Sequence, residues 1–466
     1  MTSVLPTLSL RSGVLSAVVL LSLYSKSKQQ NSYMKKTLLF IATLLASYVG
    51  MAQETYQPTA ENLKAREQFQ DDKFGIFLHW GLYSMMGTTE WIMTNRDINY
   101  KEYPKLAKTF YPSEFDADAW IKAIKAAGAK YITITTRHHD GFSLYKTATS
   151  TYNSVDGSPF KRDIIKELAD ACKRHDIKLH LYYSHLDWGR EDYPVGRTGT
   201  GTGRPKEKAN WASYYKFMNT QLTELLTNYG KVGAIWFDGW WDHDSDAKPF
   251  DWQLEEQYAL IHKLQPQCLV ANNHHHTPFP GEDIQIFERD LPGENKAGLS
   301  GQSIGRLPLE SCQTINEHWG YNITDTLYKS PKELIQMLVR AAGKNANLLL
   351  NIGPEPGGAL PELALNRLQA IGEWLNKYGE TIYGTRGGIV GPHEWGVSTQ
   401  RGNKLYIHIL NCMDSSLFIP TGNHKIKSAT VFATNKRVNF TKTGNGITLN
   451  LDTIPTDIDY IVELTL

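Results

Sequence analysis

Short hydrophobic runs alternate with amphipathic stretches from about residue 70 to residue 385. The runs predict buried β-strands, and the stretches with apolar residues at helical spacing predict helices. The expected strands cover 74–80, 130–136, 178–184, 232–237, 269–273 and 347–353. The expected helices cover 116–127, 163–175, 208–228, 253–264, 331–343 and 361–378. This alternation predicts a parallel sheet with crossover helices, and the number of units favours an irregular, TIM-type (β/α)8-like barrel. An open, doubly wound sheet is the alternative, but no glycine-rich dinucleotide loop follows the first strand.

The pattern changes after Gly387 and Gly388. Turn residues then separate short strand-like segments, and helical periodicity is absent. These segments cover 404–410, 429–433, 446–451 and 460–464. We therefore expect a barrel domain over 54–386 and a C-terminal antiparallel β-sandwich over 387–466. A glycine- and threonine-rich stretch at 196–203 is expected to be a mobile loop.

The first 53 residues are not expected to belong to the fold. Residues 34–53 have a basic start, an apolar middle and a small-residue end, which predicts a secretory signal peptide cut near Ala52. Residues 1–33 contain another apolar run, so we expect translation to start at Met34; a second leader is the alternative. After Ala52 no apolar run is long enough to span a membrane, and no cysteine follows the signal to carry a lipid anchor. The mature protein is therefore expected to be soluble and exported, to the periplasm or the medium.

Composition narrows the function only slightly. The 466 residues, 41% of them hydrophobic, suffice for one large and one smaller domain. The net charge of +1 gives no reason to expect a nucleic-acid partner. Of the four cysteines, Cys172 and Cys268 lie in apolar-periodic segments and are expected to be buried thiols, and the spacing does not indicate a disulfide. The sequence does not indicate an oligomeric state.

Asp238 is the most informative single residue. It ends the hydrophobic run at 232–237 and is followed by a glycine and two tryptophans. Barrel enzymes carry their chemistry at this end of their strands. Tryptophan beside a carboxylate suits a sugar, because the indole can cover the apolar face of the ring while the carboxylate reacts. The alternative is that Asp238 only caps the next helix.

Other expected strands also end in polar or aromatic residues. These strand ends are 79–81, 137–141, 182–185 and 272–276. Polar groups that converge at one barrel mouth are hard to explain by packing, because buried polar groups need partners. The histidines at 138–139 and 274–276 could supply metal ligands. However, adjacent residues of a strand point to opposite faces, so we expect neither a metal nor a cofactor.

Glycoside hydrolysis needs two carboxyl groups, one to attack the anomeric carbon or activate water and one to protonate the leaving oxygen. Asp238 suits the first role, and the second group is expected on a loop from a neighbouring strand. The segment 281–295 offers several candidates. The carboxylates expected near the mouth are Glu90, Asp140, Asp187, Asp238, Asp242, Glu282, Asp283, Glu288, Glu294 and Glu310.

Seven motifs along the chain together resemble glycoside hydrolase family 29, the α-L-fucosidases, in the order of that family. They lie at 74–84, 90–91, 136–142, 181–184, 236–238, 319–321 and 347–354, and the resemblance runs from about 58 to 390. It implies an irregular β/α barrel followed by a β-sandwich. It also implies release of L-fucose from fucosylated oligosaccharides or glycoconjugates with retention, through a covalent fucosyl-enzyme.

The resemblance also implies roles for individual residues. Asp238 would be the nucleophile and Glu288 the acid/base, with Glu294 the second choice and Glu310 a third that is better explained as structural. The fucose pocket would be lined by His79, Glu90, Trp91, His138, His139, Tyr182 or Tyr183, Trp236 and Trp319. The family often carries an Asn-Asp-Arg segment where this chain has 272–274, so the contact of that arginine must be made differently here, or by one of the histidines.

Three alternatives remain at this stage. They are a retaining glycosidase for a related sugar such as an α-galactoside, a carbohydrate-binding barrel without catalysis, and a metal-dependent hydrolase. The linkage specificity, broad or restricted to α-1,3/4, is not indicated.

Overall fold

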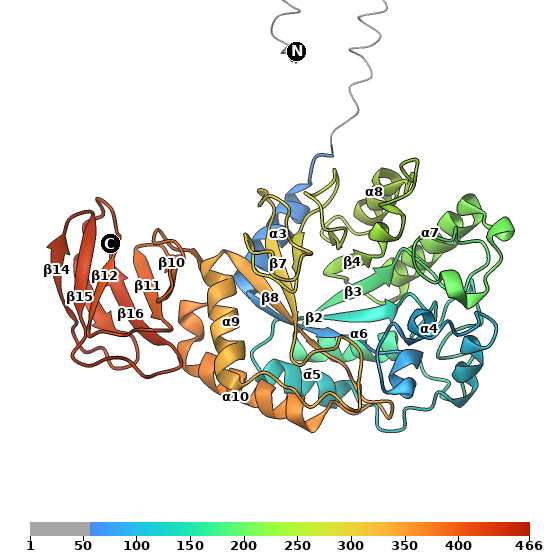
Figure 1. Ribbon diagram of the computed structural model, residues 1–466, viewed down its shortest axis with the longest axis horizontal. Coiled ribbons are helices and arrows are strands. Elements are labelled where there is room, and N and C mark those ends of the chain that lie inside the picture. The colour runs from blue at the N-terminus through green and yellow to red at the C-terminus, as the bar shows by residue number, and fades with distance from the viewer. Residues whose placement is uncertain (1–55) are drawn as a thin grey trace, which may run out of the picture. The chain divides into compact units, whose positions relative to one another are not determined.

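Eight parallel strands form a nearly closed barrel in the computed structural model, which describes residues 56–466 (Figure 1). The predicted signal peptide lies outside the described residues. The sheet order is β5-β4-β3-β2-β1-β8-β7-β6, and a parallel bridge between Ala271 and Ile284 joins its two edges. The strands are β1 (Phe74–Leu78), β2 (Tyr131–Arg137), β3 (Lys178–Ser184), β4 (Ala234–Asp238), β5 (Leu269–Asn272), β6 (Gln285–Glu288), β7 (Leu309–Thr314) and β8 (Ala346–Ile352).

Helices connect most of these strands. They are α3 (Ala60–Asp72), α4 (Ile92–Asn95), α5 (Ala117–Ala126), α6 (Ile164–His175), α7 (Trp211–Asn228), α8 (Leu254–Leu264), α9 (Pro331–Gly343) and α10 (Glu362–Tyr378). Short 3-10 helices cover Leu82–Met86, Tyr103–Thr109, Thr200–Thr202, Lys206–Lys208, Trp240–His243 and Gly379–Thr381. The connections from β5 to β6 and from β6 to β7 contain no helix in this part of the described chain, which makes the barrel irregular.

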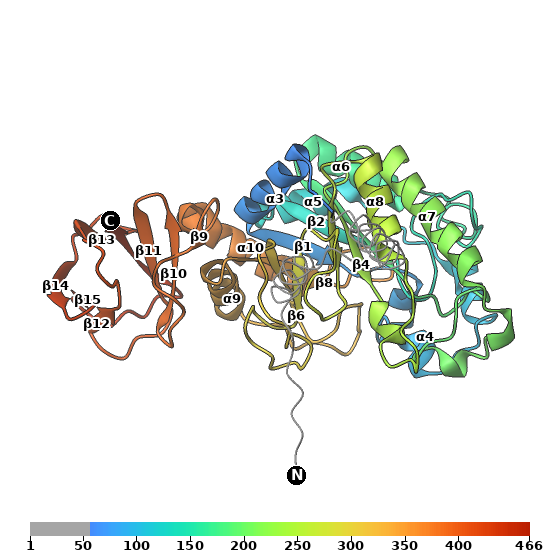
Figure 2. The same cartoon turned by 90° about the horizontal axis from the view of Figure 1, so that it is seen from above.

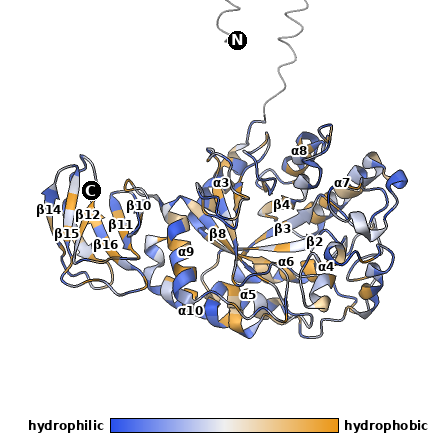
Figure 3. Ribbon diagram, in the orientation of Figure 1, coloured by the Kyte–Doolittle hydropathy of each residue, from blue (hydrophilic) through white to orange (hydrophobic). Residues whose placement is uncertain are grey.

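Local sequence signals explain where several helices begin. The side chains of Asp116 and Asp163 accept hydrogen bonds from backbone N–H groups in the first turns of α5 and α6. Ser330 and Glu333 form a reciprocal capping box at the start of α9. Figure 3 shows that the surrounding helices carry both hydrophobic and hydrophilic stretches, as expected for helices with one face in the core.

The pleat of the strands divides the barrel core into two layers. Outward-facing side chains such as Tyr183 and Phe237 pack against the helices. Inward-facing side chains such as Phe77, Tyr182 and Trp236 fill the barrel interior. Cys172 and Cys268 are buried free thiols, as predicted.

The C-terminal strands form two antiparallel sheets. One has the order β13-β16-β11-β10-β9 and the other the order β12-β15-β14. The strands are β9 (Arg386–Gly387), β10 (Gly396–Arg401), β11 (Lys404–Ile409), β12 (Ser416–Ile419), β13 (Ser428–Val431), β14 (Asn439–Thr443), β15 (Gly446–Asn450) and β16 (Tyr460–Thr465). Leu405, Ile407 and Val462 from the first sheet share one hydrophobic core with Ile447 and Leu449 from the second. This is a β-sandwich, so the predicted fold class, a β/α barrel followed by a sandwich, is confirmed.

In Figures 1 and 2, α9 and α10 lie between the barrel strands and the sandwich. The side chain of Gln336 on α9 donates to the carbonyl groups of Leu410 and Ile458 in the C-terminal part. Within residues 56–466 no helix combines the length and the apolar content that a membrane crossing requires.

Candidate active site

A cavity of about 190 Å³ opens at the carboxyl ends of the barrel strands. Its volume suits one sugar ring better than an oligosaccharide. Aromatic walls surround a few polar groups, which is typical of a small-molecule site. The lining residues are Phe77, His79, Glu90, Trp91, His138, Arg197, Trp236, Asp238, Trp241, Asn273, His275, Glu288, Leu299, Cys312 and Trp319.

Asp238 ends β4 and is held in one orientation by several donors. Its Oδ2 accepts the Tyr182 hydroxyl proton at 3.0 Å. Its Oδ1 accepts from Trp241 Nε1 at 3.0 Å and from the Gly239 backbone at 2.9 Å. Burial, together with the negative charge of Glu288, raises the pKa of Asp238 to about 6. The carboxylate is therefore held in place and largely shielded from solvent, as expected of a nucleophile at this position.

Glu288 ends β6 and shares one hydrogen-bond partner with Asp238. Asn273 Nδ2 lies 2.8 Å from Glu288 Oε2 and 3.4 Å from Asp238 Oδ1. One amide group therefore contacts both carboxyl groups, which places them in the same part of the cavity. Hydrolysis of a glycoside by two carboxyl groups requires such an arrangement.

His275 is the second partner of Glu288, and its Nε2 lies 2.9 Å from Oε2. Burial raises the pKa of Glu288, but the hydrogen bond and charge of His275, the hydrogen bond from Asn273 and the charge of Arg289 together outweigh burial and leave that pKa below its usual range. Burial lowers the pKa of His275, but the hydrogen bond and charge of Glu288, together with the charge of Asp238, outweigh burial and leave the pKa of His275 above its usual range.

His79 is positioned by Asn351 on β8. The Asn351 amide donates to the backbone carbonyl of Trp319, so its oxygen remains to accept from His79 Nδ1 at 2.6 Å. Burial lowers the pKa of His79 to about 4, so the ring is neutral near pH 7. Nδ1 then carries the only ring proton, and Nε2 is an acceptor suited to a sugar hydroxyl.

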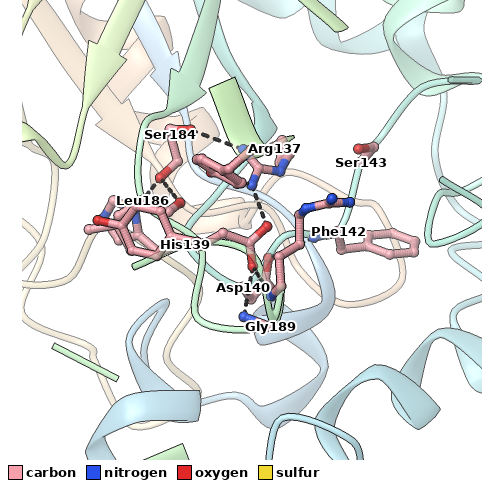
Figure 4. Close-up of polar contacts among 12 residues, drawn as sticks. Arg137, His139, Asp140, Phe142, Ser143, Ser184, Leu186 and Gly189 are labelled. Carbon is pink, nitrogen blue, oxygen red and sulfur yellow. Dashed lines mark hydrogen bonds and ion pairs between the residues drawn. The ribbon is translucent and has the colours of Figure 1, made fainter. Parts of the chain in front are cut away.

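Ser184 positions His139 in a similar way (Figure 4). The Ser184 hydroxyl donates to the Leu186 carbonyl at 2.6 Å, so it accepts from His139 Nδ1 at 2.7 Å. Burial keeps the pKa values of His138 and His139 well below the usual range. Neutral His139 therefore presents an acceptor, Nε2, 3.5 Å from Asp238 Oδ2. It does not stabilise the Asp238 carboxylate, in agreement with the raised pKa of that group.

Tryptophans form much of the cavity wall. Trp91 stacks on Trp241 with ring centroids 5.5 Å apart, while Trp236 and Trp319 line the same cavity. Glu90 Oε2 accepts the Gly320 backbone N–H at 2.9 Å and so anchors the loop that carries Trp319.

Not every residue predicted for the site reaches the cavity. Tyr183 faces away and donates its hydroxyl proton to Gln221 on α7. Tyr182 and His139 do not line the cavity either, but both contact Asp238, which does. Glu294 pairs with Lys296 and Lys344 instead of lining the cavity. Glu310 lies inside the barrel, where it accepts from Tyr131 and Trp236.

The other expected carboxylates have structural partners. Tyr103 binds Asp140, and Arg137 binds Asp187. Tyr193 binds Asp242, Tyr258 binds Glu282, and Arg66 binds Asp283. Among the described residues, no group of His, Cys, Asp and Glu side chains is arranged to hold a metal ion.

The site residues predicted from the sequence did not include several residues that line the cavity. They are Phe77, Arg197, Trp241, Asn273, His275, Leu299 and Cys312. Several of them lie in stretches that the sequence did single out. Asn273 and His275 belong to the polar run at the end of β5, Trp241 is the second tryptophan after Asp238, and Phe77 lies in the motif at 74–84. Arg197 comes from the predicted mobile loop, and its guanidinium lies 5.2 Å from the Trp241 ring centroid.

Two carboxyl groups bridged by one amide, aromatic walls and neutral imidazoles at a barrel mouth are the features expected of a glycoside hydrolase site. Residues 43–380 match the family described as Alpha-L-fucosidase. The chain is 30% identical over 407 residues to the plasma alpha-L-fucosidase of Rattus norvegicus, covering 79% of this chain and 83% of that one. It is 30% identical over 368 residues to a putative alpha-L-fucosidase of Caenorhabditis elegans, covering 73% and 71%.

Solved structures agree with this match. Alpha-L-fucosidase isoenzyme 1 from Paenibacillus thiaminolyticus superposes with a TM-score of 0.77 at 34% identity, covering 87% of this chain and all of that one. An alpha-L-fucosidase GH29 from Bacteroides thetaiotaomicron, trapped as a covalent intermediate with 2-fluoro-fucosyl fluoride, gives a TM-score of 0.75 at 27% identity, covering 89% and 98%. The chain belongs to the alpha-L-fucosidase family, glycoside hydrolase family 29, and is a retaining glycoside hydrolase.

Proposed function

We propose that this protein is an exported α-L-fucosidase that removes terminal α-L-fucosyl groups from glycans with retention. Family membership supports the reaction class. The observation that carries the residue assignments is the pairing of Asp238 and Glu288 in one cavity through the Asn273 amide.

The reaction has two steps. In the first, the Asp238 carboxylate attacks the anomeric carbon while Glu288 protonates the departing oxygen. In the second, Glu288 removes a proton from water, which attacks the same carbon and releases Asp238. The donors from Tyr182 and Trp241 hold Asp238 in place for both steps.

Fucose is a 6-deoxy sugar with one methyl group and three free hydroxyls. The proposed pocket offers Trp236 and Trp319 as apolar surfaces for the ring and its methyl group. His79 offers an imidazole acceptor and Glu90 a carboxylate for the hydroxyls. A galactoside carries a hydroxymethyl group in place of the methyl group, and its hydroxyl would lose its water against an aromatic wall.

Azide rescue tests both assignments. Asp238→Gly should lose nearly all turnover of an aryl α-L-fucoside and partly recover in azide with a fucosyl azide product, whereas a variant with wild-type turnover would contradict the assignment. Glu288→Ala should recover strongly in azide with an activated aryl fucoside. Glu294→Ala is the matched control, because its partners are Lys296 and Lys344, and it should behave like the wild type. Strong azide rescue of Glu294→Ala instead would move the acid/base role to that residue.

Sugar specificity is tested with matched aryl glycosides. Aryl α-L-fucoside should be turned over far faster than aryl α-galactoside, and the reverse order would contradict the proposal.

The proposed export rests on the sequence pattern at 34–53. Expression of the full chain in a bacterium, followed by fractionation and N-terminal sequencing, tests it. The expected product lies outside the cytoplasm and begins near Gln53. An uncleaved chain in the cytoplasm would contradict export.

A further inference from the structure

The loop that follows β5 carries three consecutive histidines, and the structure separates their roles. His274 Nδ1 accepts the His276 backbone N–H at 3.0 Å, so its ring proton lies on Nε2. Nε2 lies 3.0 and 3.1 Å from the two carboxylate oxygens of Glu282. His274 is thereby fixed in the wall, and it anchors the loop. His276 is exposed, with its ring 5.0 Å from that of Trp240.

His275 is the one that lines the cavity, and its backbone explains why. Its φ of +65° lies in the left-handed region, which is uncommon for a residue other than glycine. The neighbouring histidines point elsewhere, so this local conformation directs the His275 ring to Glu288. Strain of this kind persists where the surrounding structure enforces it, often at functional sites.

The same loop supplies Asn273, whose amide donates to both carboxyl groups of the site. If the Asn273 side chain were flipped, its carbonyl oxygen would face two carboxylate acceptors. The two carboxylates therefore fix the side chain with its NH2 group toward them. Glu288 thus receives both of its side-chain hydrogen bonds from the loop after β5.

We propose that His275 is a positioning residue for the acid/base: it holds Glu288 in place and stores the proton that Glu288 delivers to the leaving oxygen. The inference rests on the proposed function, because it takes Glu288 to be the acid/base. The supporting geometry is the 2.9 Å contact from His275 Nε2 to Glu288 Oε2, the left-handed backbone at His275 and the anchoring of the loop by His274.

The proton balance is as follows. In the resting pair His275 is protonated and Glu288 is ionised. As the bond from the anomeric carbon to the leaving oxygen breaks and the bond to Asp238 forms, Glu288 gives a proton to that oxygen and receives the His275 proton. His275 is left neutral. In the second step water gives a proton to Glu288, the remaining hydroxide oxygen bonds to the anomeric carbon, and the proton returns to His275.

The charges around His275 agree with this resting state. Glu288 and Asp238 face the ring and favour its protonation, while Arg197 opposes it. On the other side of the pair, Arg289 favours the ionised form of Glu288. The balance raises the pKa of His275 and lowers that of Glu288, so the pair keeps one proton to a higher pH than a lone carboxyl would.

The test compares two substrates that differ in their need for an acid. An α-L-fucosyl disaccharide has a poor leaving group and needs protonation, whereas an aryl fucoside with a strongly activated leaving group does not. The variants are His275→Gln, which can hydrogen-bond but cannot store a proton, and His276→Gln, an exposed neighbour that serves as the control. Thermal unfolding of each variant checks that the fold is retained.

His275→Gln should lower kcat/KM for the disaccharide by about 10- to 100-fold, less than the loss of the acid itself (~100- to 10,000-fold) because Glu288 remains, and change the aryl value by less than about threefold. Its basic limb on the disaccharide should move to lower pH, because the proton then leaves the buried Glu288 carboxyl instead of an imidazole whose pKa lies above its usual range. His276→Gln should match the wild type. Equal losses on both substrates, or an unmoved basic limb, would overturn the inference.

Glu288→Gln separates this inference from the function on which it rests. Suppose that Glu288→Gln loses activity mainly on the disaccharide, whereas His275→Gln loses activity equally on both substrates. The inference about His275 is then wrong, and the acid/base assignment stands. If Glu288→Gln lowers both kcat/KM values alike, the acid/base assignment itself fails, and with it the inference.

Discussion

The acid limb of the pH profile should report the ionisation of Asp238, because only the carboxylate can attack the anomeric carbon. Burial, with a further contribution from the charge of Glu288, raises the pKa of Asp238 from 3.8 to about 6. That rise of about two units corresponds to ~3 kcal/mol in favour of the neutral acid. Wild-type kcat/KM should therefore fall as the pH drops through about 6, to about a tenth of its plateau at pH 5.

The perturbation is Glu288→Gln, which removes the neighbouring negative charge and keeps the volume. The acid limb should then move to lower pH, because the neutral form of Asp238 is less favoured. Burial is the larger cause of the shift and remains, so the new limb should lie between the ordinary value of about 3.9 and 6. The charge of His275 has a smaller and opposite effect on the pKa of Asp238, so a change in that charge does not reverse the movement.

The assay is kcat/KM from pH 4 to 8 with an aryl fucoside whose leaving group needs no protonation, so that loss of the acid does not obscure the limb. His276→Gln is the control and should keep the wild-type limb. A wild-type limb near pH 4, or a limb that does not move in Glu288→Gln, would refute the reasoning about Asp238.

Three further predictions concern stability. Asp238 has a folded pKa above its unfolded one, so its ionisation destabilises the fold fully above about pH 6 and not below about pH 4. Asp238→Asn should therefore raise the free energy of unfolding by up to ~3 kcal/mol at pH 7.5, with a higher melting temperature, and leave it unchanged at pH 4. An equal gain at both pH values would contradict this. Glu310→Ala should lower the free energy of unfolding by about 1–3 kcal/mol for each donor left unpaired, at Tyr131 and at Trp236. Glu310→Gln should lower it less and leave the ratio of kcat/KM values for poor and good leaving groups unchanged. A loss of kcat/KM confined to substrates with a poor leaving group would instead make Glu310 an acid. Asp187→Ala leaves the fully buried Arg137 guanidinium without its carboxylate and should cost about 3–5 kcal/mol in urea unfolding; a loss below about 1 would show that Arg137 finds another partner.

The sequence predicted most of the barrel because its strands are continuous hydrophobic runs buried on both faces. Strands β6 and β7 were not predicted, because they lack this pattern. Each carries polar side chains with a specific task, such as Glu288 in the cavity and Glu310 under Trp236, so neither strand has the hydrophobic pattern. The strand expected from residue 232 begins at Ala234.

The site was predictable where a residue ends a regular strand. Asp238, His79 and His138 lie where the barrel rule places chemistry. The choice between Tyr182 and Tyr183 depends on the phase of the pleat, which the pairing of Tyr182 with Trp236 reveals.

Loop residues were harder to predict. The inward turn of His275 depends on a left-handed backbone that the run of histidines does not reveal. Arg197 reaches the cavity from a loop about 40 residues before Asp238, and its position depends on tertiary contacts.

The most direct test of the central claim is to identify the residue that carries the sugar in the covalent intermediate. The protein is treated with 2-fluoro-fucosyl fluoride, digested and analysed by peptide mass spectrometry. The account predicts one fluorofucosyl adduct, on Asp238. An adduct on another carboxylate, or turnover without any adduct and with inversion at the anomeric carbon, would contradict it.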